Sequence, residues 1–120
     1  MREINLPLIL CYHAVSSEWP CSVAIPESTI AAQLSFFHRR GYVGLTFAEA
    51  ERRRLDRTLP RRSLVVTFDD GFASILRALP ILEQFDFPAT VFVVTKFTED
   101  RQPLSWPGLE RWLLSGHADE

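Results

Sequence analysis

The stretch that most constrains this chain is the short run from Leu64 to Phe68, which is followed directly by Asp69, Asp70 and Gly71. The run is rich in β-branched and apolar residues and too short for a typical helix, which predicts a strand buried on both faces of a parallel sheet. In open α/β sheets and βα barrels, ligands bind at the carboxyl ends of such strands. Because an unpartnered carboxylate is costly to bury, Asp69 and Asp70 indicate a functional site that holds a metal, a cation or a proton.

Strand and helix patterns alternate along the rest of the chain. Apolar runs predict strands over residues 6–12, 42–45, 64–68 and 88–95. Apolar stripes with capping residues predict helices over residues 26–40, 46–55, 72–86 and 106–115. Pro80 inside the third helix predicts a kink or two short helices, and polar residues predict loops over 14–25 and 96–105. This alternation predicts an α/β fold with parallel strands, and the chain ends where the next strand is expected.

Composition narrows the class of protein. The chain has 120 residues, of which 47% are hydrophobic, enough for the core of one domain. Its net charge of −2 argues against a nucleic-acid partner. No apolar run approaches the roughly 20 residues of a membrane span, and no signal peptide is evident, so we expect a cytoplasmic protein. Cys11 and Cys21 form neither a disulfide framework nor a paired-cysteine metal motif.

Several motifs together resemble the polysaccharide deacetylase family, also called the NodB-homology domain or carbohydrate esterase family 4. The central one is Thr67-Phe68-Asp69-Asp70-Gly71. Its surroundings match as well, in the segments Tyr12-His13-Ala14-Val15, Gln33-Leu34, Arg40-Gly41-Tyr42, Leu79-Pro80-Ile81-Leu82 and Pro88-Ala89-Thr90-Val91-Phe92. Trp106 and Gly116-His117 look like the helix that leads to the family's second motif, so the resemblance extends over essentially the whole chain.

The resemblance implies the N-terminal part of a deformed (β/α) barrel, incomplete in this chain. Residues 1–120 then form a partial NodB-homology domain that stops before the second motif, His-Ser/Thr-x-x-His, which supplies two histidine ligands to the metal. His117 is not part of such a pair, so no ligand role is transferred to it.

The resemblance also implies the chemistry, which is metal-dependent hydrolysis of a carbon–nitrogen bond that removes N-acetyl groups from a glycan such as an N-acetylglucosamine polymer. Asp69 is then the general base, and Asp70 is the carboxylate ligand of a divalent metal, expected to be zinc. Since one carboxylate holds a transition metal poorly, we expect the 120-residue chain to be inactive as a lone monomer.

Two further residues are candidates for substrate contact. His13 ends the first predicted strand and could face the same site, or it could pack and hydrogen-bond beside Tyr12. Trp19 lies in the following loop and could line the site or cover the core. The strand over residues 89–95 is expected to keep an open edge, through which the chain could associate with itself.

Two alternatives come from other classes. One is a non-catalytic fragment or one half of a split enzyme. The other is a receiver-like or phosphatase-like domain, in which paired aspartates after a strand bind Mg²⁺. That domain needs a further Asp at a strand end and a Lys at another. Lys96 follows a predicted strand, but no suitable third Asp is evident.

Overall fold

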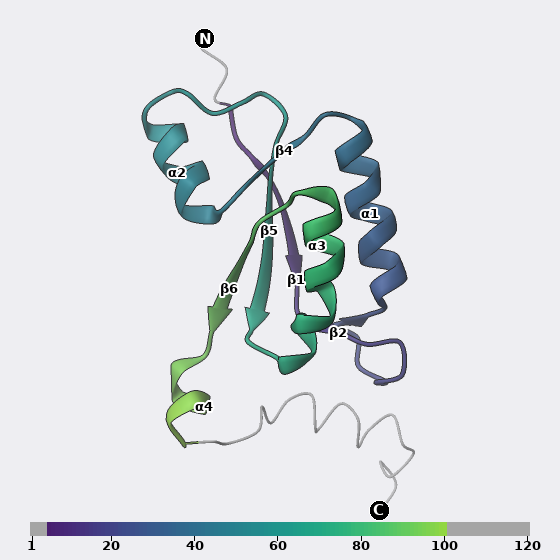
Figure 1. The fold of residues 1–120 in the computed structure, drawn as a ribbon. Coiled ribbons are helices and arrows are strands. Elements are labelled where there is room, and N and C mark those ends of the chain that lie inside the picture. The colour runs from purple at the N-terminus through teal and green to yellow at the C-terminus, as the bar shows by residue number, and fades with distance from the viewer. Residues whose placement is uncertain (1–4, 101–120) are drawn as a thin grey trace, which may run out of the picture.

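The structure of this protein is a computed structural model that describes residues 5–100. Its main sheet has four parallel strands arranged around β5 (Ser63–Asp70) (Figure 1). β1 (Leu8–Tyr12) pairs along one side of β5. On the other side, β4 (Val43–Leu45) pairs with the first residues of β5 and β6 (Ala89–Val93) pairs with the last. The four predicted strands and the parallel α/β fold are confirmed, and β5 runs on to include both aspartates.

Helices connect the strands, as the alternating pattern predicts. Three predicted helices are present within the described residues, and the third of them is divided in two. The helical elements are α1 (Glu27–Arg39), α2 (Phe47–Leu55), the 3₁₀ helix η1 (Ala73–Ala78), α3 (Leu79–Phe85) and α4 (Thr95–Asp100). The fourth predicted helix, over residues 106–115, lies outside the described residues. Over residues 5–100, no helix has the length and apolarity needed to cross a bilayer.

The predicted break at Pro80 is confirmed. η1 ends at Ala78, and α3 begins at Leu79, so that Pro80 lies in the first turn of α3. A backbone N–H in the first turn has no partner within the helix, so proline costs little at this position.

Two loop predictions are wrong. α4 occupies part of the predicted loop over residues 96–105, because a short polar helix has no apolar stripe to reveal it. The predicted loop over 14–25 contains a small parallel pair, β2 (Ala14–Val15) with β3 (Ala24–Ile25). Strands of two residues are too short to show an alternating pattern.

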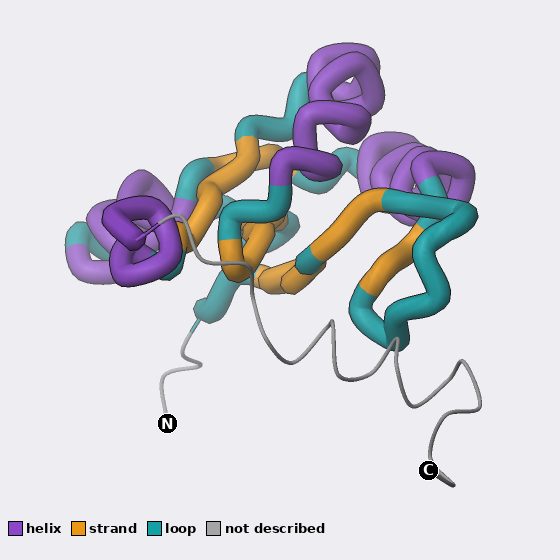
Figure 2. The backbone as a smooth tube through the Cα atoms, turned by 90° about the horizontal axis from the view of Figure 1, so that it is seen from below, coloured by secondary structure: helices purple, strands orange, loops and turns teal. Residues whose placement is uncertain are grey.

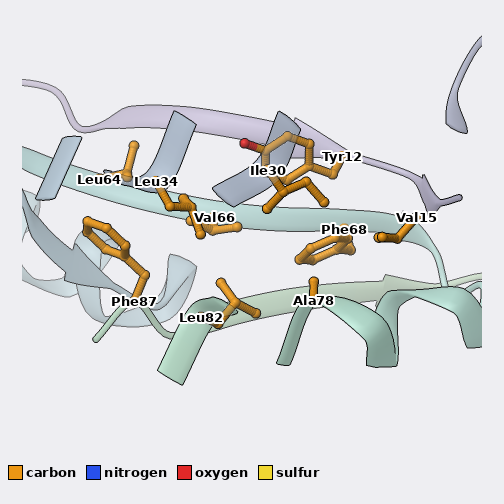
Figure 3. Close-up of a cluster of buried hydrophobic side chains, with 10 residues drawn as sticks. All are labelled: Tyr12, Val15, Ile30, Leu34, Leu64, Val66, Phe68, Ala78, Leu82 and Phe87. Atoms are coloured by element: carbon orange, nitrogen blue, oxygen red, sulfur yellow. The ribbon is translucent and has the colours of Figure 1, made fainter. Parts of the chain in front are cut away.

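The two faces of β5 pack differently because successive side chains of a strand point to opposite faces. Leu64, Val66 and Phe68 form one face and are almost fully buried against α1 and α3, with the Phe68 ring 5.4 Å from that of Tyr12 (Figure 3). Figure 2 shows these two helices gathered on one side of the orange strands. On the opposite face Val65 packs in a smaller cluster with residues of β4, α2 and the loop after α2.

That second face is open where it passes over β1. The side chain of Ile9, on this face, is 46% exposed. The same face continues toward the carboxyl ends of β1 and β5, where the predicted functional residues lie.

Candidate active site

The carboxyl ends of β1 and β5 bring the candidate residues together. The register pairs Cys11 with Thr67 and Tyr12 with Phe68, so His13 follows β1 at the level where Asp69 continues β5. His13 Nε2 lies 4.0 Å from Asp69 Oδ2, and the two side chains are 29% and 40% exposed. The prediction that His13 and the aspartates share one end of the sheet is confirmed.

Tyr12 and His13 point to opposite faces of β1. The Tyr12 ring is in the core, and its hydroxyl donates a hydrogen bond to Gln33 Oε1 at 2.5 Å. Burial of this side chain raises the pKa of Tyr12 to about 12. His13 is directed toward Asp69 instead, on the side of β1 away from the Tyr12 ring.

A residue that the sequence did not single out also reaches Asp69. The thiol of Cys11 donates a hydrogen bond to Asp69 Oδ2, with 3.5 Å between the heavy atoms. Desolvation raises the pKa of the Cys11 thiol, and the negative charges of Asp69 and Asp70 raise it further, against a hydrogen bond with Thr67 that lowers it. Cys11 lies two residues before His13, which places both on one face. This spacing does not show that Asp69 lies beside them, because that depends on the register between β1 and β5.

Asp70 and Gly71 turn the chain out of β5. Both adopt left-handed backbone conformations, with φ of 73° at Asp70 and 74° at Gly71. Glycine adopts this region without steric cost, whereas a residue with a Cβ atom is strained there. A Cβ at Gly71 would also lie 3.3 Å from a methyl group of Val93. The turn therefore places a strained, half-buried aspartate at the end of the strand.

Trp19 packs beside this turn. Its ring lies edge-on against Phe72, with 5.3 Å between centroids, and its backbone N–H donates to Ser16 Oγ. Separately, a hollow of about 410 Å³ borders β1 and is lined by residues that include Cys11, His13 and Gln33. Contact of His13 or Trp19 with a substrate stays a prediction.

The donor atoms bear on the predicted metal site. Within residues 5–100, one set of three side chains brings candidate ligand atoms within 4.8 Å of one another, and it consists of Cys11, His13 and Asp69. Asp70, the ligand that the resemblance implies, belongs to no such set in this part of the chain. His117 lies outside the described residues. The described residues thus supply one ligand of the expected type and do not by themselves complete that site.

Comparison with known proteins gives concordant matches. Residues 56–118 match the sequence profile of the family described as polysaccharide deacetylase. The Bacillus subtilis (strain 168) protein YxkH, which carries the name of a polysaccharide deacetylase, is 32% identical over 97 residues, or 79% of this chain and 34% of YxkH. The poly-β-1,6-N-acetyl-D-glucosamine N-deacetylase of Escherichia coli K12 is 33% identical over 69 residues, or 56% of this chain and 10% of that protein.

The fold has solved counterparts too. The structure of IcaB from Ammonifex degensii aligns with a TM-score of 0.63 at 34% identity, covering 74% of this chain and 38% of the IcaB chain. The chain thus spans about a third of the length of YxkH and of the IcaB structure. A chain that covers about a third of these proteins is consistent with one part of a (β/α) barrel.

Proposed function

Because the chain belongs to the polysaccharide deacetylase family, we propose that it supplies the general base and one metal ligand of a site that removes N-acetyl groups from a glycan. The observation that carries this proposal is the position of Asp69 and Asp70 at the carboxyl end of β5, within the matched segment. The same match favours a hydrolase over the receiver-like alternative.

Asp69 suits the role of general base. Its side chain is 40% exposed, so a water molecule and a substrate can reach it. As the water oxygen bonds to the acetyl carbon, Asp69 accepts a proton from that water. The carbon–nitrogen bond then breaks and the nitrogen takes up a proton, which gives acetate and a free amine. His13, 4.0 Å from Asp69, is placed to orient the carboxylate or to contact the sugar.

Asp70 suits the role of metal ligand. The family uses a divalent metal, for which we propose zinc; when bound, it would polarise the amide carbonyl. Asp70 is one carboxylate, and the remaining ligands would come from outside residues 5–100. We therefore propose that residues 1–120 form part of a NodB-homology domain and that this stretch alone releases no acetate.

The proposed substrate is a polymer that contains N-acetylglucosamine. The support is the matched E. coli relative, whose name specifies a poly-β-1,6-N-acetyl-D-glucosamine. The carboxylate of Asp69 is 40% exposed, so a sugar can approach the proposed base.

The test separates the two aspartates in an active protein that contains residues 1–120. All variants carry Cys11→Ser, so that the thiol 3.5 Å from Asp69 adds no metal ligand. Acetate release is followed as zinc is titrated. Asp69→Asn should lower the rate by about 10²–10⁴-fold at every zinc concentration, since it removes a base. Asp70→Asn should raise the half-saturating zinc concentration by about tenfold or more, since it removes a ligand.

Asp86→Asn is the matched control, because Asp86 shares the left-handed backbone of Asp70, at φ of 55°, and is exposed. Asp86→Asn should change neither the rate of acetate release nor the half-saturating zinc concentration. The two assigned roles are wrong if extra zinc restores the acetate release of Asp69→Asn while Asp70→Asn has the same half-saturating zinc concentration as the parent.

A further inference from the structure

Three different metal-binding groups meet on the open face of the sheet. Cys11 and His13 are two residues apart at the end of β1, and Asp69 lies beside them on β5. The parallel register of β1 against β5 brings these side chains close together. A hydrogen bond from Thr67 Oγ1 to the carbonyl of Leu10 also connects the two strands next to Cys11. The backbones of Cys11 and Asp69 are thus held by paired strands, and His13 lies directly after β1 and directly before β2.

The spacing of the donor atoms suits a zinc ion. Zinc holds sulfur at about 2.3 Å and nitrogen or oxygen at about 2.0–2.2 Å, so tetrahedral neighbours lie about 3.4–3.6 Å apart. Cys11 Sγ is 3.5 Å from Asp69 Oδ2, and His13 Nε2 is 4.0 Å from the same oxygen. All three atoms lie within 4.8 Å of one another. A movement of about 1 Å in the partly exposed His13 side chain would therefore bring the three donor atoms to the spacing of tetrahedral zinc ligands.

We propose that Cys11, His13 and Asp69 form a binding site for a thiophilic divalent ion such as Zn²⁺, distinct from the ligand set to which Asp70 belongs. Thiolate and imidazole select zinc-like ions over Mg²⁺ and Ca²⁺, which prefer oxygen ligands. Three protein ligands would leave one position of a tetrahedral ion open to solvent. Cys11 is exposed, and the side chains of His13 and Asp69 are 29% and 40% exposed, so an ion can reach this position.

The site would act on the proposed general base. An ion held by Asp69 occupies the carboxylate oxygens that would otherwise take a proton from water. Zinc bound here would therefore oppose hydrolysis. This consequence depends on the proposed function, whereas the binding itself does not.

Binding is tested on the 120-residue chain with Co²⁺ and Zn²⁺ alone. Circular dichroism first establishes that each variant is folded. Titration with Co²⁺ should produce a thiolate-to-cobalt charge-transfer band that saturates at one equivalent, and one equivalent of Zn²⁺ should remove it. Cys11→Ser should abolish the band, and His13→Gln should raise the dissociation constant by about tenfold or more.

Two controls separate this site from others. Cys21→Ser removes the second cysteine, which is buried and lies outside the cluster, and should leave the titration unchanged. Asp70→Asn should also leave it unchanged, although the same change should impair the proposed deacetylation. A band that survives Cys11→Ser, or that disappears in Asp70→Asn, would overturn the proposal, as would the lack of any band in the folded parent chain.

Discussion

Asp70 holds a backbone conformation that its side chain does not favour. A residue with a Cβ atom in the left-handed region is strained by about 1–3 kcal/mol, and such strain concentrates at functional sites. We expect Asp70→Gly to be more stable than Asp70→Ala by about 1 kcal/mol, because both lack the carboxylate and differ only in the Cβ atom at φ of 73°. Urea denaturation of the two variants measures this difference in the free energy of unfolding.

Asp69 provides the control for that comparison. Its φ is not in the left-handed region, and it lies within β5. Within a strand, glycine is less stable than alanine by about 0.5–1 kcal/mol. Asp69→Gly should therefore be less stable than Asp69→Ala. The same order of stability at both positions would show that the turn at Asp70 is not strained.

Tyr12 should make the fold sensitive to alkali. The folded state raises the pKa of Tyr12 to about 12, above its usual value near 10, because the side chain is buried. A raised pKa means that the folded state holds the proton more tightly. The resulting stability is complete below about pH 10 and is lost as the pH rises toward 12, by roughly 2–3 kcal/mol. Denaturation series at several pH values measure this loss.

Tyr12→Phe should flatten that pH dependence, because the variant has no hydroxyl to ionise. Tyr42→Phe serves as the control, since Tyr42 packs against the edge of the same core. It should keep the pH dependence of the parent. An equal effect of the two substitutions would contradict the role given to Tyr12.

At the scale of residues, the sequence revealed some of the site and hid the rest. Asp69 and Asp70 could be predicted because they end an apolar run, and this pattern is local. The contact of Cys11 with Asp69 could not be predicted, because it depends on the register between two strands that are far apart in the chain. No spacing within the first strand shows which residue of β5 will lie beside it.

At the scale of elements, α2 depends on its N-terminal cap. Thr46 Oγ1 accepts a hydrogen bond from the backbone N–H of Glu49 at 3.2 Å. Thr46→Ala should lower the free energy of unfolding by about 1 kcal/mol. Thermal or urea denaturation measures the loss, and Thr58→Ala, at an exposed threonine in the loop after α2, should have little effect.

The arginines of α2 pair with its glutamates at the surface. Arg52 and Arg53 contact Glu49, and Arg54 contacts Glu51. These contacts lower the pKa of both glutamates, first through hydrogen bonds from the arginines. Because exposed pairs add little stability, the basic run is a solvated helix face and the cap is the more important feature.

The elements were predictable where a long pattern revealed them. α1, α2 and the four main strands carry an apolar stripe, a cap or a continuous apolar run, and all were found in the structure. β2 and β3 are held by tertiary contacts and hydrogen bonds to each other, which no local pattern of two residues can encode. Short elements of this kind depend on the surrounding fold rather than on their own sequence.

At the scale of the whole molecule, the sheet has open edges. Among residues 5–100, no strand pairs with the outer side of β1 or of β6. Both strands also carry large exposed apolar side chains, including Ile9 and Phe92. Such edges favour pairing between copies. We expect the 120-residue chain to self-associate as its concentration rises, which sedimentation velocity would detect.

A charge on the edge strand should weaken that association. Ile9→Lys places a lysine on β1, which blocks edge-to-edge pairing. Leu55→Lys is the matched control, because Leu55 is 66% exposed and is the last residue of α2 rather than part of an edge strand. If the parent chain is monomeric at all concentrations, or if Leu55→Lys dissociates it as well as Ile9→Lys does, association through the edge is excluded.

The central place of β5 has a consequence for how the chain is made. Within the described residues, β1, β4 and β6 each pair with β5 and none pairs with another of the three. A nascent chain that has left the ribosome as far as β4 therefore has no partner strand for β1, although β1 was synthesised first. The main sheet can begin to form only once β5 starts to emerge, because β4 and β1 pair with residues 63–68 of that strand. The strand that carries the two aspartates thus also sets the moment at which this protein can start to fold.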